Sequence, residues 1–377
     1  MLKTTTYHAI GLMSGSSLDG LDMAYCSFTL SENETALADI SWKLLKAETI
    51  PFSDKWVSRL ANLPTQNALD FSKTHTYFGH YMAELVNDFL RKHPVDPDFI
   101  ASHGHTIFHY PEKLMTVQIG DGAALAAKTG YPVICDFRTH DIALEGEGTP
   151  IAPAADRYLF KDYDFLLNIG GIANITLNNP KGPTAFDIGP ANQVLNMLAQ
   201  QADQPYDKDG LLATAGKVNN NLLELLNHND YFDTQPPKSL DNQWIQTEVF
   251  PVYQNHKASI NDQLHTACQQ LAEQTAKAID YLILKEALNK DRYKLLATGG
   301  GALNLFLIKC IREQVNKKYS IDLEVPHLDI VLYKEAILMG LMGVLRVANI
   351  PNCFSSVTGA AMDTVGGAIY QGIRRKI

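Results

Sequence analysis

The sequence has no long basic run and no excess of positive charge. Its 32 lysines and arginines stand against 41 aspartates and glutamates, which gives a formal net charge of -9 at pH 7. Nucleic acids and anionic membranes are bound through clustered Lys and Arg. The charge balance therefore excludes both as expected partners.

Cysteines are few, and their spacing shows no pairing. The five of them are scattered along the chain, and no two form a C-x-x-C pair. A disulfide framework or a structural zinc site needs paired cysteines. We therefore expect reduced, buried thiols in a cytoplasmic protein.

Long apolar runs are also absent. No run approaches the roughly 20 residues of a membrane-spanning helix, and the first residues lack the apolar core and cleavage site of a signal peptide. The composition, with 46% hydrophobic and 19% charged residues, is typical of a folded protein. A length of 377 residues exceeds what one core usually supports, so we expect two domains.

The most distinctive stretch is Ile10–Asp22, in which glycines and serines separate two apolar strands. Such a turn offers backbone N–H groups and hydroxyls to a phosphate, but an ordinary tight hairpin has the same composition. Leu21 and Asp22 stand where a P-loop requires Lys and Ser or Thr, and no G-x-G-x-x-G motif opens a helix here. A phosphate-binding hairpin and a purely structural turn both stay open.

A second hairpin of this kind lies at 165–177, where apolar strands flank Gly170 and Gly171. Paired phosphate hairpins in two domains are the arrangement of the internally duplicated sugar-kinase, Hsp70 and actin superfamily. We therefore interpret both turns as phosphate-binding. The predicted fold class is α/β, with two domains of this ribonuclease H-like type around a central ATP and substrate cleft.

Asp187 ends a predicted strand, just before the turn Gly189-Pro190 and a helix. A carboxylate at a strand end near phosphate hairpins is placed for general-base catalysis. A turn or helix N-cap aspartate occupies the same kind of position. We favour the general base.

A third glycine-rich turn, Gly299-Gly300-Gly301, joins the predicted strand 293–298 to a helix. Bare backbone lets a flat ring or ribose approach closely, and the helix N-terminus favours an anion. We interpret this turn as the adenosine contact. The alternative is a tight strand-to-helix connection.

Three histidines, His103, His105 and His109, follow the predicted strand 99–102. His103 and His105 would share one face of an extended chain, as two metal ligands could. No cysteine or carboxylate lies close in sequence to complete such a site. We favour substrate contacts by His103, His105 and Thr106.

A polar loop, 140–150, follows Arg138. We interpret it as a sugar-binding loop between domains, in which Arg138 pairs with a carboxylate on the ligand and Glu145 joins the sugar contacts. A solvated surface crossover is the alternative.

Toward the C-terminus the pattern predicts a strand at 330–332 and a helix from Tyr333 to about Val347. Glu335 would lie in the first helical turn, where the helix dipole favours an acid; a substrate contact is the functional alternative. The chain is expected to return to the first domain near 357–359 and to end in a short basic helix.

Together these motifs resemble those of the anhydro-N-acetylmuramic acid kinase family, in the same order and over nearly the whole chain. They are Gly11–Gly20, Ser102–Thr106, Asp136–Arg138, Asn168–Asn174, Phe186–Pro190 and Thr298–Ala302. The resemblance implies a cytoplasmic, homodimeric kinase of cell-wall recycling that uses ATP and Mg²⁺. Its substrate would be a small anhydro amino sugar, 1,6-anhydro-N-acetylmuramic acid, opened at the anhydro bridge and phosphorylated on O6.

The resemblance also implies residue roles. Asp187 would be the base that activates water, and Glu335 a second catalytic residue that orients sugar or water. The ATP phosphate loop would comprise Gly15, Ser16, Ser17, Leu18, Asp19, Gly20, Leu21 and Asp22. The expected lobes are residues 1–138 with 362–377, and residues 139–361.

Two departures from the family pattern limit these expectations. Met13 stands where the wider superfamily has a metal-organising aspartate, so the Mg²⁺ ligands are unknown and Asp19 is only a candidate. The segment 241–244 replaces an arginine-containing one. Two other functions stay open: a kinase that phosphorylates a free hydroxyl, and a non-enzymatic nucleotide-dependent module related to Hsp70 or actin.

Overall fold

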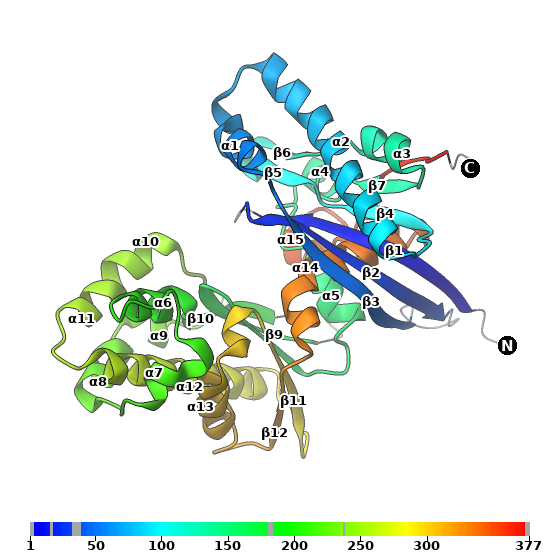
Figure 1. Cartoon of the computed structure of the whole chain (residues 1–377). Coiled ribbons are helices and arrows are strands. Elements are labelled where there is room, and N and C mark those ends of the chain that lie inside the picture. Colours follow the sequence, from blue (N-terminus) through cyan, green and yellow to red (C-terminus); the bar gives the residue numbers. More distant parts are fainter. Residues whose placement is uncertain (1–3, 16–17, 32–38, 180–183, 237, 374–377) are drawn as a thin grey trace. The chain divides into compact units, whose positions relative to one another are not determined.

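The computed structural model describes residues 4–15, 18–31, 39–179, 184–236 and 238–373 (Figure 1). The chain separates into two compact units. Unit 1 comprises Met1–Phe160 with Tyr333–Ile377, and unit 2 comprises Lys161–Leu332. Among the described residues, no helix is both long and apolar enough to cross a membrane.

Unit 1 is built on a six-stranded sheet with the strand order β13-β7-β4-β1-β2-β3, beside a two-stranded sheet of β5 and β6. Its strands are β1 Thr4–Ser14, β2 Gly20–Ser31, β3 Asp39–Pro51, β4 Phe99–Ser102, β5 His105–Tyr110, β6 Met115–Ile119, β7 Val133–Cys135 and β13 Ala368–Tyr370. Its helices are α1 Asp54–Asn62, α2 Ala68–Lys92, α3 Gly122–Thr129, α4 Thr139–Ala143, α5 Pro153–Tyr158 and α15 Ser355–Thr358, with most of α14 Leu328–Val347.

Unit 2 is built on a five-stranded sheet with the order β10-β9-β8-β11-β12. Its strands are β8 Phe165–Ile169, β9 Ile172–Leu177, β10 Thr184–Pro190, β11 Tyr293–Thr298 and β12 Ile321–Glu324. Its α-helices are α6 Asn192–Gln200, α7 Leu211–Thr214, α8 Asn220–Asn227, α9 Asp230–Asp233, α10 Asn242–Trp244, α11 Phe250–Gln254, α12 Ile260–Lys285 and α13 Leu305–Val315.

The two sheets repeat one topology. In unit 1, β1, β2 and β3 form an antiparallel meander, and β4 and β7 continue the sheet parallel to β1. In unit 2, β8, β9 and β10 form the meander, and β11 and β12 continue it parallel to β8. This duplicated arrangement confirms the predicted α/β fold class.

The sheet of unit 1 is covered on both faces, because its central strand alternates between two cores. Ile10 and Leu12 belong to a cluster with Phe78 and Met82 of α2. Gly11 faces α14, where a Cβ would lie 1.8 Å from the carbonyl oxygen of Ala336. Only glycine at this position lets the helix pack so close to the strand.

The unit boundaries differ from the predicted lobes, since residues 139–160 and 333–361 fall in unit 1. Long-range contacts explain this difference. Within unit 1 the Glu147 amide donates to the carbonyl of Thr358 at 2.8 Å, and the Ala361 amide donates to the carbonyl of Leu144 at 3.0 Å. A pairing of segments more than 200 residues apart leaves no local signal in the sequence.

Asp141 holds these two segments together from a fully buried position. One carboxylate oxygen accepts the Gly148 amide and the other accepts the Thr358 hydroxyl, both at 2.8 Å. A buried donor left unpaired costs about 1–3 kcal/mol. We therefore expect Asp141→Ala to lower the free energy of unfolding by about 2 kcal/mol or more, measured as an earlier urea midpoint. Glu147→Ala, at an exposed site of the same loop, is the control, and equal midpoints for the two variants would contradict the assignment.

Two predicted elements are wrong. Residues 330–332 are helical, because α14 begins at Leu328, and the amides of Ile330 and Val331 both donate to the His327 carbonyl. The basic C-terminal helix is wrong for Ala368–Tyr370, which form strand β13 antiparallel to β7. The last four residues lie outside the described part of the chain.

Candidate active site

The first predicted phosphate hairpin is the turn between β1 and β2. Its described part is held by the Leu18 amide, which donates to the Gly15 carbonyl at 3.3 Å. Gly20 is required by the neighbouring strand, since a Cβ there would lie 2.6 Å from the Ile50 carbonyl oxygen. Leu21 is buried and Asp19 is exposed. Ser16 and Ser17, both predicted phosphate contacts, lie outside the described residues.

Acidic groups gather beside this hairpin. Burial raises the pKa of the Asp22 carboxyl, and the charges of Asp19 and Glu335 raise it further; a 2.5 Å hydrogen bond from the Thr49 hydroxyl acts in the opposite direction. Glu335 is exposed and is the eighth residue of α14. The prediction that it lies in the first helical turn is therefore wrong. Among the described residues, no group of three or more His, Cys, Asp or Glu side chains could hold a metal ion.

His103 lies at the end of β4 with one ring nitrogen left open. Its Nδ1 lies 3.1 Å from the Gly104 carbonyl, which can only accept, so this nitrogen carries the proton. Burial and then the Arg138 charge lower the pKa of His103 to about 4, so the ring is neutral at pH 7. Its buried Nε2 has no hydrogen-bond partner within the described chain. Nε2 therefore presents an unused acceptor.

The other histidines of this motif have different partners. His105 Nδ1 lies 3.0 Å from the hydroxyl of Ser14, which ties β5 to the end of β1. His109 Nδ1 lies 3.1 Å from the hydroxyl of Thr116. The Thr106 hydroxyl accepts a long hydrogen bond, 3.4 Å, from the side-chain amide of Gln118. Each of the three histidines therefore has a different hydrogen-bond partner.

Arg138 supplies the matching open donor. Its Nε is buried and has no hydrogen-bond partner among the residues described. Burial lowers the pKa of the guanidinium, and the charge of Glu335 acts against this shift. The charge of Arg138 thus acts on His103, and that of Glu335 acts on Arg138, all three residues being in unit 1. Buried polar groups are normally hydrogen-bonded. We therefore interpret His103 Nε2 and Arg138 Nε, which lack partners among the described residues, as contacts for a polar ligand.

Glu145 does not join this group in the described structure. It is exposed, with a φ of 65°, and its amide donates to the Ile142 carbonyl at 3.0 Å. A cavity of about 270 Å³ lies within unit 1. His103 is one of its lining residues, together with His75, Gln118 and Asp136.

In unit 2 the two glycine turns pack against each other. Gly299 has a φ of 81°, and a Cβ there would lie 2.7 Å from the Ile169 carbonyl oxygen; at Gly301 a Cβ would lie 2.3 Å from Ile169 Cγ2. The turn at Gly170 is closed by the Asn192 amide, which donates to the Gly170 carbonyl at 3.1 Å. Gly300 is exposed and Gly171 is exposed. The turn at Gly170 and Gly171 and the turn at Gly299–Gly301 therefore lie side by side with exposed backbone, as a nucleotide-binding surface would require.

Asn192 joins these turns, and the sequence reasoning did not assign it a role. Its side-chain amide donates to the Ile169 carbonyl at 3.2 Å, and its Oδ1 lies 3.0 Å from the point where a Cβ on Gly301 would stand. The sequence feature that could have indicated a role for Asn192 is its position directly after the Asp187 motif, at the start of α6.

Asp187 lies in β10, one of the two edge strands of its sheet as described, at a point where the pairing with β9 is irregular. The register shifts between Asp187 and Gly189, and such bulges re-aim side chains. The Leu240 amide donates to Oδ2 at 2.8 Å. Burial raises the pKa of the half-buried carboxyl above its ordinary value of 3.8, and the Leu240 hydrogen bond acts in the opposite direction.

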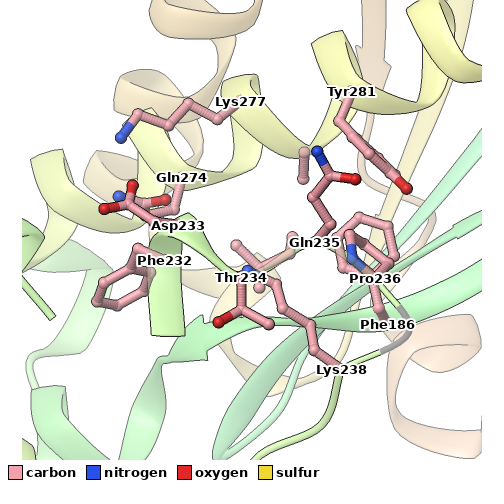
Figure 2. Close-up of a pocket in the computed structure, with 12 residues that line it drawn as sticks. Phe186, Phe232, Asp233, Thr234, Gln235, Pro236, Lys238, Gln274, Lys277 and Tyr281 are labelled. Atoms are coloured by element: carbon pink, nitrogen blue, oxygen red, sulfur yellow. The ribbon is translucent and has the colours of Figure 1, made fainter. Parts of the chain in front are cut away.

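A pocket of about 130 Å³ lies beside this strand. It is lined by Phe186 and Ile188 of β10, by residues 232–236 and Lys238, and by Gln274, Lys277 and Tyr281 of α12 (Figure 2). Asp187 itself is not among the lining residues. The pocket therefore lies between α12 and the residues at the end of α9 and just after it.

Comparisons with known proteins point to one family. A family model described as anhydro-N-acetylmuramic acid kinase matches residues 7–372. A protein of Pasteurella multocida (strain Pm70), named anhydro-N-acetylmuramic acid kinase, is 30% identical over 391 residues, and the alignment covers 98% of each chain.

Solved structures show weaker similarity. One is the activator of the 2-hydroxyisocaproyl-CoA dehydratase from Clostridium difficile with bound ADPNP. Its sequence identity is 12% and its TM-score 0.36, and the alignment covers 92% of this chain and 97% of the activator chain. Hexokinase from Schistosoma mansoni, complexed with glucose, has 9% identity and a TM-score of 0.30, with coverages of 90% and 87%. Similarity at this level assigns no ligand.

Proposed function

The chain belongs to the anhydro-N-acetylmuramic acid kinase family and is a phosphotransferase; from this premise we propose that it opens the anhydro ring of its sugar and phosphorylates it in one reaction. The substrates are 1,6-anhydro-N-acetylmuramic acid, water and ATP. The products are N-acetylmuramic acid 6-phosphate and ADP, in the recycling of peptidoglycan.

The anhydro substrate dictates the chemistry, because its O6 is bonded to C1 and carries no proton for a base to remove. Water attacks C1 and loses one proton to a carboxylate, while the bond between C1 and O6 breaks. O6 takes the γ-phosphoryl group as the bond from that phosphorus to the ADP oxygen breaks. One water is consumed, and one C–O bond is exchanged for another at C1.

Asp187 is the base in this proposal. The observation that carries the assignment is its half-buried carboxylate, with a raised pKa and one oxygen, Oδ2, fixed by the Leu240 amide. Among the described residues, Oδ1 has no hydrogen-bond donor. A raised pKa makes the carboxylate a stronger base, and general-base assistance contributes about 100- to 10,000-fold.

Unit 1 supplies the proposed sugar contacts. Arg138 is a donor for the carboxylate of the sugar, and a guanidinium fork suits such a group. His103 Nε2 is an acceptor for a sugar hydroxyl or amide N–H, and His105, Thr106 and Glu145 complete the predicted set. We propose that Glu335, close to Arg138 by its effect on the arginine pKa, orients the sugar or the attacking water.

We assign the nucleotide to the glycine turns. The hairpin Gly15–Asp22 and the turn at Gly170 and Gly171 would bind the phosphates. The turn at Gly299–Gly301 would bind the adenosine. Carboxylate oxygens suit Mg²⁺, which uses one or two of them together with waters and phosphates. Asp19, which is exposed beside the hairpin turn, is the candidate ligand. The ion would neutralise phosphate charge.

A phosphorylation assay tests the proposed function. Purified 1,6-anhydro-N-acetylmuramic acid and Mg-ATP should give a reducing sugar phosphate, seen by mass spectrometry as a gain of one water and one phosphoryl group. N-acetylmuramic acid, with a free 6-hydroxyl, is the comparison substrate. Faster phosphorylation of that sugar would favour an ordinary hydroxyl kinase. The homodimer and the cytoplasmic location stay predictions.

A further inference from the structure

The segment that carries Tyr231, Lys238 and Leu240 contacts Asp187 through three hydrogen bonds. The Tyr231 hydroxyl donates to the Asp187 carbonyl at 2.7 Å, and the Asp187 amide donates to the Lys238 carbonyl at 3.2 Å. The third bond runs from the Leu240 amide to Oδ2 at 2.8 Å. Because β10 is an edge strand, this segment takes the place of a neighbouring strand at this one residue.

The segment is also tied to itself. Lys238 Nζ donates to the Tyr231 carbonyl at 2.9 Å and lies 4.4 Å from the centroid of the Tyr231 ring. A cation held over an aromatic face in a partly desolvated site is stabilising. The ring packs in turn against Trp244, with centroids 5.3 Å apart. Two of the groups that reach Asp187, the Tyr231 hydroxyl and the Lys238 carbonyl, therefore belong to residues that contact each other.

A pocket lies between this segment and α12. Its volume is about 130 Å³, and it is lined by residues 232–236 and Lys238 on one side and by residues of the helix on the other (Figure 2). The contact between Lys238 and Tyr231 joins the two ends of this segment. Weakening it should let the segment shift relative to β10.

We infer that Tyr231 and Lys238 are positioning residues for Asp187, which hold its backbone and so fix the direction of its carboxylate. This inference rests on the proposed role of Asp187 as the base. The Leu240 amide favours the charged carboxylate and lowers its pKa against the effect of burial. If the segment shifts, this hydrogen bond lengthens and the pKa of Asp187 rises.

Two substitutions test the inference. Tyr231→Phe removes only the hydroxyl, and Lys238→Met removes the charge while keeping an unbranched side chain. We expect each to lower kcat by about tenfold or more, since small misplacements of catalytic groups cost up to about 100-fold, with the KM for ATP unchanged. We also expect the acid limb of the kcat–pH profile to move to higher pH. Lys238→Arg, which keeps the cation over the ring, should restore much of the activity.

Tyr281→Phe is the matched control. This tyrosine lines the same pocket and packs edge-on against Phe186, with centroids 6.0 Å apart. It should keep the wild-type kcat and pH profile.

The outcomes separate this inference from the proposed function. If Asp187→Asn is inactive while both segment variants keep the wild-type kcat and acid limb, the positioning role is wrong and the base stands. Lower kcat with an unmoved acid limb would also overturn it, as a merely structural effect. A fully active Asp187→Asn would remove the role of Asp187 as the base, on which this inference rests, and would leave the phosphorylation of the anhydro sugar to be judged by its own assay. Near-ultraviolet circular dichroism of each variant verifies that the tertiary structure is retained.

Discussion

We expect Asp187→Asn to lose about 100-fold or more of its turnover with the anhydro sugar, because the amide cannot accept the proton of the attacking water. The side-chain oxygen of asparagine can still accept the Leu240 amide, which lies 2.8 Å from Oδ2 in the wild type. The fold and ATP binding should therefore be preserved. Steady-state kinetics, thermal unfolding and ATP titration measure these three properties.

The pH dependence gives a second readout for the same residue. The base must be unprotonated, and burial raises its pKa above 3.8. Turnover of the wild type should therefore fall as the pH drops through this raised pKa, at a pH higher than an ordinary aspartate would give. The residual activity of Asp187→Asn should lack this limb.

Asp203→Asn is the matched control for charge removal. Asp203 is an exposed residue of unit 2 with a φ of 57°, a conformation that asparagine adopts readily. It should turn over like the wild type. Wild-type turnover by Asp187→Asn would show that another group activates the water.

We expect Arg138→Met to raise the KM for the anhydro sugar by about 10- to 150-fold, as loss of a hydrogen bond to a charged group costs about 1.5–3 kcal/mol. The buried Nε of Arg138 has no partner within the described chain, so the ligand carboxylate is the group we assign to it. The KM for ATP should not change. Arg138→Lys should restore only part of the affinity, since lysine keeps the charge without the planar fork.

A substrate without the carboxylate makes this prediction specific. 1,6-Anhydro-N-acetylglucosamine lacks the lactyl group, so the wild type should bind it weakly and Arg138→Met should bind it no worse. Arg59→Met, which removes an exposed arginine over the ring of Trp56, should leave both sugars unaffected. An equal loss of affinity for both sugars in Arg138→Met would mean that the arginine serves the fold.

Local patterns predicted the framework of the candidate site. The hairpin between β1 and β2, the glycine turn after β8 and the strand that carries Asp187 follow from short apolar runs interrupted by small residues. His103 and Arg138 follow strand ends, where side chains can face a ligand. Such features depend on neighbours in sequence, so sequence alone could predict them.

Tertiary contacts decided the features that the sequence did not predict. Residues 330–332 form a β-branched and leucine run that favours a strand, yet the helix begins at Leu328 and places Glu335 two turns along it. Residues 139–160 belong to unit 1 through Asp141, whose partner Thr358 lies far along the chain. The contacts of Tyr231 and Leu240 with Asp187 likewise join segments more than 40 residues apart.

The reaction in ¹⁸O-labelled water tests the central claim most directly. If water opens the anhydro ring at C1, the N-acetylmuramic acid 6-phosphate formed carries ¹⁸O at C1 and none at O6. Unlabelled product incubated for the same time corrects for slow exchange of the anomeric oxygen. A product with no label at C1 beyond this control would contradict the account.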